Sequence, residues 1–155
     1  MKKTFFAIIL PIILIESICS QTIVKELLTE NLIDPVGLDI SIPRFTWILQ
    51  NEKRGITQTA YEIEVESNDT FAWRSGRVLS DSSVLVAYKG LPLKSNTLYF
   101  WRVRVQDNRG YISDWSLPGS FRTGFLQPSD WKAQWITPTL EEDTVNRPSP
   151  YLRKT

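Results

Sequence analysis

The stretch TAYEIEVES at residues 59–67 decides the fold class, because its apolar and polar residues alternate from Tyr61 to Glu66. Successive side chains of a β-strand point to opposite faces, so Tyr61, Ile63 and Val65 share one face while three glutamates occupy the other. The stretch LYFWRVRVQ at residues 98–106 repeats this alternation. The two stretches therefore predict two half-buried β-strands.

The chain around these two stretches predicts further short strands and no helix with an apolar face. Strands are expected at Ile23–Thr29, Arg44–Gln50, Trp73–Val78, Ser82–Tyr88 and, interrupted near Pro118, Tyr111–Phe125. Residues 31–43 are expected to form a loop, because the positions before their prolines disfavour helix. About seven short strands separated by turn residues predict an all-β sandwich.

The expected core is rich in aromatic and branched side chains. Two facing sheets would bury Phe45, Trp47, Tyr61, Ile63, Val65, Trp101, Val103 and Val105. Burying a large apolar side chain stabilises a fold by roughly 1.5–3 kcal/mol, so a core of this size supports a sandwich without disulfides.

The composition excludes several kinds of chemistry. The chain of 155 residues has no histidine, one cysteine and a formal net charge of +1. It therefore lacks the residues for Ser-His-Asp or Cys-His catalysis, for a disulfide framework and for a basic nucleic-acid surface. Loop aspartates at 34, 39 and 69 do not form a dense calcium-binding pattern, so we expect no metal and no cofactor. The remaining catalytic option is a carboxylate pair of the glycosidase kind.

Residues 1–20 have the layout of a secretory signal peptide. Two lysines at the start precede an apolar run at residues 5–15, and small residues follow before a cut after Ser20. The run is shorter than the roughly 20 residues of a membrane-spanning helix. We expect a bacterial protein that is secreted or periplasmic and begins at Gln21. The alternative is a lipoprotein anchored through Cys19.

The pattern changes after the expected sandwich, which covers residues 22–125. Gln-Pro-Ser-Asp at 127–130 is typical of a linker, and Trp131 and Trp135 begin a new apolar pattern. Too few residues follow to form a core. Residues 126–155 are therefore expected to be a linker and the incomplete, loosely packed start of a second β-sandwich.

One segment resembles a known fold family. GLPLKSNTLYFWRVRV at residues 90–105 is similar to strand F, and the turn before it, of fibronectin type III domains. The resemblance implies an immunoglobulin-like or fibronectin type III-like sandwich of about seven strands, with a tyrosine corner at Leu93, Thr97 and Tyr99. The tetrapeptide SDWS at 113–116 resembles a Trp-Ser element of cytokine-receptor relatives of that fold. We interpret both features as architecture.

A more specific resemblance covers nearly the whole chain after residue 20. Its motifs, in order, are LLTENLIDPVGLD (27–39), PRFTW (43–47), QTAY (58–61), WRSGRV (73–78), YFWRVR (99–104) and DWKAQWI (130–136). They are similar to the opening of bacterial α-L-rhamnosidases, which are glycoside hydrolases. The resemblance implies a second β-sandwich after the last motif, with an early strand at Ser149–Lys154. The family's catalytic acids lie in an (α/α)₆ barrel several hundred residues downstream, so we assign no catalytic residue and expect an inactive, truncated product.

The charged residues of the two strands quoted first share one solvent face. They are Glu62, Glu64, Glu66, Arg102 and Arg104. Glutamates two residues apart on one strand lack an opposing acid, so we interpret the row as a solvated face rather than a catalytic site. Cross-strand ion pairs with the arginines, and stacking of Trp115 on one arginine, are expected.

Four aromatic residues are expected at the surface, where a ring can stack on a sugar or pack against a neighbouring domain. They are Trp73, Tyr88, Tyr111 and Trp115. The leading hypothesis is a structural module whose partners are the downstream domains of a secreted rhamnosidase. The alternatives are a carbohydrate-binding module for rhamnose-containing glycans and an active α-L-rhamnosidase. Binding to nucleic acid, or to a membrane after signal cleavage, is not expected.

Overall fold

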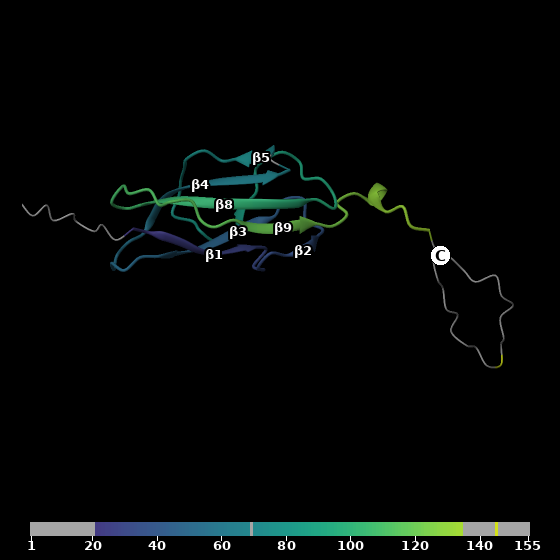
Figure 1. The fold of residues 1–155 in the computed structure, drawn as a ribbon, viewed down its shortest axis with the longest axis horizontal. Helices are drawn as coiled ribbons and strands as arrows, with labels where there is room; N and C mark the ends of the chain where they lie inside the picture. The colour runs from purple at the N-terminus through teal and green to yellow at the C-terminus, as the bar shows by residue number, and fades with distance from the viewer. Residues whose placement is uncertain (1–20, 69, 135–144, 146–155) are drawn as a thin grey trace, which may run out of the picture.

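The computed structural model describes residues 21–68, 70–134 and 145, and its strands form a sandwich of two β-sheets (Figure 1). The strands are β1 Ile23–Thr29, β2 Val36–Leu38, β3 Arg44–Gln50, β4 Gln58–Ser67, β5 Thr70–Arg74, β6 Val78–Leu79, β7 Val86–Ala87, β8 Leu98–Asp107 and β9 Gly119–Thr123. The larger sheet has the order β2-β9-β8-β4-β5, with β6 also paired to β4, and the smaller sheet has the order β1-β3-β7. The expected all-β sandwich is confirmed.

Strands β4 and β8 form the centre of the larger sheet and are antiparallel, with the expected side chains facing the core. The cross-strand neighbours are Tyr61 and Val105, Ile63 and Val103, and Val65 and Trp101. All six side chains are buried. Because a shift of one residue would turn all of them to solvent, this burial confirms the orientation of both strands.

Strand β3 carries the aromatic residues that join the two sheets. The ring centroid of Phe45 lies 4.4 Å from that of Trp101 and 5.9 Å from that of Phe121. The ring of Trp47 meets Tyr61 at 5.2 Å. All five side chains are buried, so the core lies between β3 on one side and β4, β8 and β9 on the other.

The two core tryptophans each satisfy their indole N–H. Trp47 Nε1 donates to Gln58 Oε1 at 3.0 Å, and Trp101 Nε1 donates to Thr29 Oγ1 at 3.1 Å. Both acceptor residues are themselves buried. An unpaired indole N–H in this position would cost free energy, so these bonds allow two large rings to fill an otherwise apolar core.

The expected tyrosine corner is present at the start of β8. The backbone N–H of Lys94 donates to Tyr99 Oη at 2.8 Å, and the N–H of Thr97 donates to Thr123 Oγ1 at 3.0 Å. Leu93 packs partly buried against the core. The turn before β8 is thereby tied both to its own strand and to β9.

The expectation of an uninterrupted loop at residues 31–43 was wrong. β2 lies within it and runs parallel to β9. Gly37, with φ +81°, allows the backbone to turn at this point, and the N–H of Gly124 donates to Leu38 O at 2.6 Å. A three-residue strand is too short for a visible alternation, and its partner is more than 80 residues away in the chain.

The edge strand expected at residues 73–78 is instead divided between β5 and β6, both paired to β4. The division falls at Gly76, which has φ +60°. The hydroxyl of Ser75 accepts a hydrogen bond from the N–H of Ile63 at 2.8 Å and takes the place of a ladder carbonyl. Small residues therefore break this strand while keeping it attached to the sheet.

Two other expected strands are shorter than the sequence indicated. Within residues 82–88 only β7 is strand; Leu85 has φ +51° and donates its N–H to Thr46 Oγ1 at 3.0 Å. Within residues 111–125 only β9 is strand. The described residues thus contain nine strands, several of them very short, where about seven were expected.

The expected domain boundaries stay predictions. A short 3-10 helix, η1, spans Pro128–Asp130 after β9. The expected signal peptide at residues 1–20 and the expected strand at Ser149–Lys154 lie outside the described residues. The same holds for most of the segment that was expected to pack loosely.

Candidate interaction surfaces

Charged side chains of β4 and β8 pair across the outer face of the larger sheet. Arg102 Nη2 lies 2.7 Å from Glu64 Oε2, and Arg104 Nη2 lies 2.9 Å from Glu62 Oε2. The expected cross-strand pairs are confirmed. Exposure was expected for all four side chains, but only Arg102 is exposed; Arg104 is half-buried, and the side chains of Glu64 and Glu62 are 17% and 23% exposed, because the arginines lie against them.

Trp115 covers both arginines of this face. The guanidinium carbons of Arg102 and Arg104 each lie 4.8 Å from the centre of the tryptophan ring. Stacking on one arginine was expected, and the structure shows it on both. Each glutamate is thus paired with an arginine, and the guanidinium groups of both arginines stack on the half-buried ring of Trp115.

Two serines place Trp115 over the sheet. Val105 N–H donates to Ser113 Oγ at 3.0 Å, and Val103 N–H donates to Ser116 Oγ at 3.1 Å. The hydroxyls act here as acceptors in place of strand carbonyls. The SDWS segment is therefore an architectural element that runs beside β8, as its resemblance to the Trp-Ser element implied.

The four aromatic residues expected at the surface do not share one environment. Tyr88 is buried, and its hydroxyl donates to Leu91 O at 2.7 Å. Burial raises the pKa of Tyr88 to about 12. Trp73 is half-buried and meets the Tyr88 ring edge at 5.4 Å. The expected exposure of Tyr88 was wrong, because the aromatic core extends to this end of the sandwich.

Tyr111 is the most exposed of the four, with 54% of its surface accessible. The guanidinium carbon of Arg109 lies 5.2 Å from its ring centre. Tyr111 follows the end of β8, Trp115 lies on the sheet face, and Trp73 and Tyr88 pack beside Phe45. The fold therefore does not bring these rings together into one flat sugar-binding platform.

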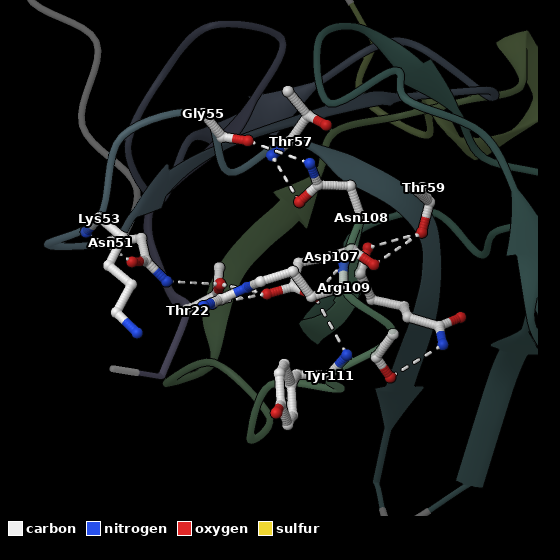
Figure 2. A network of polar contacts seen from close by, with 12 residues as sticks. Thr22, Asn51, Lys53, Gly55, Thr57, Thr59, Asp107, Asn108, Arg109 and Tyr111 are labelled. Atoms are coloured by element: carbon white, nitrogen blue, oxygen red, sulfur yellow. Dashed lines mark hydrogen bonds and ion pairs between the residues drawn. The ribbon is translucent and has the colours of Figure 1, made fainter. Parts of the chain in front are cut away.

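A buried carboxylate organises the end of the sandwich where the chain enters (Figure 2). Asp107 Oδ1 accepts the backbone N–H groups of Arg109 at 2.9 Å and Tyr111 at 3.0 Å. Asp107 Oδ2 accepts from Arg109 Nη2 at 3.1 Å and from the hydroxyl of Thr22 at 3.5 Å. One side chain thus connects the turn after β8 to the residue that precedes β1.

The charge of Asp107 is maintained despite its burial. Desolvation by burial acts to raise the pKa of this carboxyl, but the backbone N–H groups of Arg109 and Tyr111, followed by the Arg109 side chain, outweigh it and lower the pKa. Residues 107–110 were expected to be a turn, and Asp at its first position with Gly at its fourth is the usual turn signal. The contact with Thr22 had no signal in the sequence.

The neighbouring side chains extend this network to the loop between β3 and β4. Asn108 Nδ2 donates to Gly55 O at 3.0 Å, and Asn51 Nδ2 donates to Thr22 Oγ1 at 3.0 Å. Figure 2 shows these groups around the Asp107 and Arg109 pair. The network therefore joins three segments that are distant in the sequence, and its role is structural.

An open groove of about 690 Å³ lies between the start of β1 and residues 114–119. Exposed apolar side chains of Ile23, Ile33 and Leu117 line it, together with Asp34. No sequence pattern predicts this groove, because its walls come from three separate segments of the chain. Hydrophobic grooves of this kind are candidate contact surfaces for other proteins or domains.

The described part of the chain offers little for other kinds of site. Across residues 21–68, 70–134 and 145, no three Cys, Asp or Glu side chains gather as metal ligands would. No helix in the same residues has the length and apolar character needed to cross a membrane.

Two packed sheets, a tyrosine corner and an outer face of paired charges define an immunoglobulin-like β-sandwich module. More specifically, the chain belongs to the family described as Rha78A-like, N-terminal immunoglobulin domain, whose model matches residues 24–127. The resemblance to the N-terminal end of α-L-rhamnosidases is thereby confirmed.

Individual relatives agree with this family. The chain is 44% identical over 108 residues to an α-L-rhamnosidase of Streptomyces avermitilis and 39% identical over 119 residues to one of Formosa agariphila. These matches cover 66% and 72% of this chain but 10% and 12% of the relatives. The chain thus spans about a tenth of the proteins it resembles.

Solved structures give the same result. The crystal structure of Streptomyces avermitilis α-L-rhamnosidase complexed with L-rhamnose matches with a TM-score of 0.71 and 41% identity, over 75% of this chain and 12% of that one. The α-L-rhamnosidase from Dictyoglumus thermophilum matches with a TM-score of 0.69 and 34% identity, over 74% and 14%. In these relatives the matching domain is one part of a larger multidomain protein.

Proposed function

We propose that this chain is the non-catalytic N-terminal structural module of a secreted α-L-rhamnosidase-like glycoside hydrolase that degrades rhamnose-containing glycans. The observation that supports this most directly is its match to about a tenth of each curated rhamnosidase, within the family of their N-terminal domain. The module's partners are then the downstream domains of the same kind of enzyme.

The acids of the sandwich are suited to structure rather than to glycoside hydrolysis. Hydrolysis requires two carboxyl groups about 5–10 Å apart across the scissile bond, one of them with a raised pKa. Glu62 and Glu64 are bound by arginines on an open sheet face. Asp107 is enclosed, but its pKa is lowered, which is the opposite of what a general acid needs.

An activity assay on the purified mature chain tests this proposal. We expect no release of nitrophenol from an aryl α-L-rhamnoside above a buffer blank. Activity that persisted through purification and disappeared in a variant of one of the chain's own carboxylates, such as Glu62→Gln, would contradict it. Co-purified host enzyme is excluded by the same assay on a mock preparation.

Tyr111 is the observation that favours carbohydrate binding as a second candidate, because its exposed ring lies beside a guanidinium. Affinity electrophoresis in gels containing rhamnose-rich polysaccharide separates the two functions. A structural module migrates as it does in a plain gel. Retardation that is lost in Tyr111→Ala or Trp115→Ala would establish carbohydrate binding instead.

Export is also part of the proposal and has its own test. The residue after the expected cut, Gln21, directly precedes Thr22, which is buried and bonded to Asn51. Cleavage after Ser20 would therefore leave the first bonded residue of the sandwich intact. Mass spectrometry of protein expressed in a bacterial host is expected to find an N-terminus at Gln21 in the periplasm or medium; a chain beginning at Met1 would contradict export.

A further inference from the structure

The chain leaves the sandwich through a set of hydrogen bonds rather than through an open linker. After β9, the N–H of Leu126 donates to Ser95 Oγ at 2.9 Å. The hydroxyl of Ser95 in turn donates to Asp130 Oδ2, and the N–H of Gln127 donates to the same oxygen at 3.1 Å. Leu126, which precedes η1, and Asp130, the last residue of η1, are therefore both bonded to Ser95 in the turn that precedes β8.

The short helix itself is closed by backbone bonds. Asp130 N–H donates to Gln127 O at 3.0 Å, and Trp131 N–H donates to Pro128 O at 3.2 Å. Pro128 has its φ restricted by its ring, which reduces the freedom of the segment further. In Figure 1 η1 lies beyond the end of the sandwich opposite to the start of β1.

An aromatic pair lies next to these bonds. The rings of Phe125 and Trp131 meet edge to face, with centroids 5.9 Å apart and an interplanar angle of 89°. Both side chains remain more than half exposed. Large aromatic side chains that are exposed near the end of a domain are suited to contact with a neighbouring domain.

We infer that Ser95, Asp130 and the Phe125–Trp131 pair form a rigid joint, which holds residues 131–134 in one orientation relative to the sandwich. This inference rests on the proposed function, because a downstream domain gives the joint its purpose. A flexible tether would let the module sample many orientations, and docking it would then carry a larger entropy cost. Hydrogen bonds already formed within the module reduce that cost.

Distance measurements on the mature chain, residues 21–155, test the joint. Cysteines replace the exposed Ile48 on β3 and the exposed Ala133, and both receive nitroxide labels; the chain's single natural cysteine is absent from this form. Pulsed electron paramagnetic resonance then gives the distribution of label distances. We expect one narrow distribution, and a broad one in Ser95→Ala and in Asp130→Asn.

Ser129→Ala is the matched control, because it removes an exposed hydroxyl from the same short helix. It should keep the narrow distribution. A distribution that is already broad in the unsubstituted chain, or one that Ser95→Ala and Asp130→Asn leave unchanged, would overturn the inference.

A second measurement distinguishes loss of the joint from misfolding of the whole domain. Hydrogen exchange of the Leu126 amide is expected to be about fivefold faster in Ser95→Ala, because that N–H loses its acceptor, while the amides of β4 and β8 keep their protection. Equal exchange of Leu126 in both proteins would contradict the joint. Both measurements concern this chain alone, so their outcome is independent of the rhamnoside assay.

Discussion

Asp107 illustrates how a single side chain is adapted to its surroundings. Its carboxylate is enclosed by protein, where an unpaired charge would be costly, yet backbone N–H groups and the Arg109 guanidinium point at both oxygens. The charge is stable there because these donors are fixed by the turn itself. Removing the charge should therefore weaken the fold rather than any catalytic step.

Asp107→Asn is expected to lower the free energy of unfolding by about 1–3 kcal/mol, because an amide NH₂ replaces one of the accepting oxygens and faces donors. Urea denaturation at pH 7 measures the change. Asp114→Asn, at an exposed position, is the control and should stay within about 0.5 kcal/mol of the parent. Equal effects at the two positions would contradict the role assigned to Asp107.

The parent chain and Asp107→Asn also give a prediction of how stability depends on pH. The pKa of Asp107 is lowered in the folded chain, so the carboxylate stabilises the fold above its unfolded pKa of about 3.9 and loses this contribution as pH falls through the lower folded value. The stability difference between the parent and Asp107→Asn should be constant above about pH 5 and shrink in stronger acid. A stability difference that became larger in acid would contradict the lowered pKa of Asp107 in the folded chain.

Among the structural elements, the start of β8 depends on one phenolic hydroxyl. Tyr99→Phe would leave the Lys94 N–H without its acceptor and is expected to cost about 0.5–1.5 kcal/mol of unfolding free energy. Tyr111→Phe, which removes a hydroxyl from an exposed ring, serves as the comparison and should have little effect. Thermal unfolding of the two variants distinguishes them; a larger loss in Tyr111→Phe would contradict the corner's role.

The strands differ in how far the sequence predicted them. The buried faces of β4 and β8 were predicted, because the alternation over residues 61–66 and 101–106 leaves only one way to bury the apolar side chains. β2 and β7 are two or three residues long, so no period can be recognised in them. Their existence depends on partners elsewhere in the chain, which local patterns do not specify.

For the molecule as a unit, the contact between the sheets should dominate stability. Phe45→Ala removes a fully buried ring that touches Trp101 and Phe121 on the opposite sheet, and about 3–5 kcal/mol of unfolding free energy should be lost. Ile48→Ala, on the exposed face of the same strand, should cost far less. Urea titrations of both variants check this, and similar midpoints would contradict the arrangement of the core.

The candidate surfaces were predictable to different degrees. The ion pairs of Glu62 and Glu64 with the arginines, and the stacking of Trp115, followed from strand alternation and from the resemblance to a known fold. The exposure of Tyr88 was predicted wrongly, because its position at the end of a short strand does not specify which way it packs. The groove beside β1 and the joint at Ser95 were not predicted.

The alternation of residues 59–67 and 98–106 was sufficient to establish an all-β sandwich and its apolar face, and the ordered motifs were sufficient to indicate the family. The alternation is a local property, since side-chain direction along a strand depends only on the parity of positions, and the motifs can be recognised from their order in the sequence without any tertiary contact. Only the folded chain brings Thr22 to Asp107, or Ser95 to Asp130. Such contacts join residues 35 or more positions apart, so they follow from the packing of the sheets and not from any pattern within one segment.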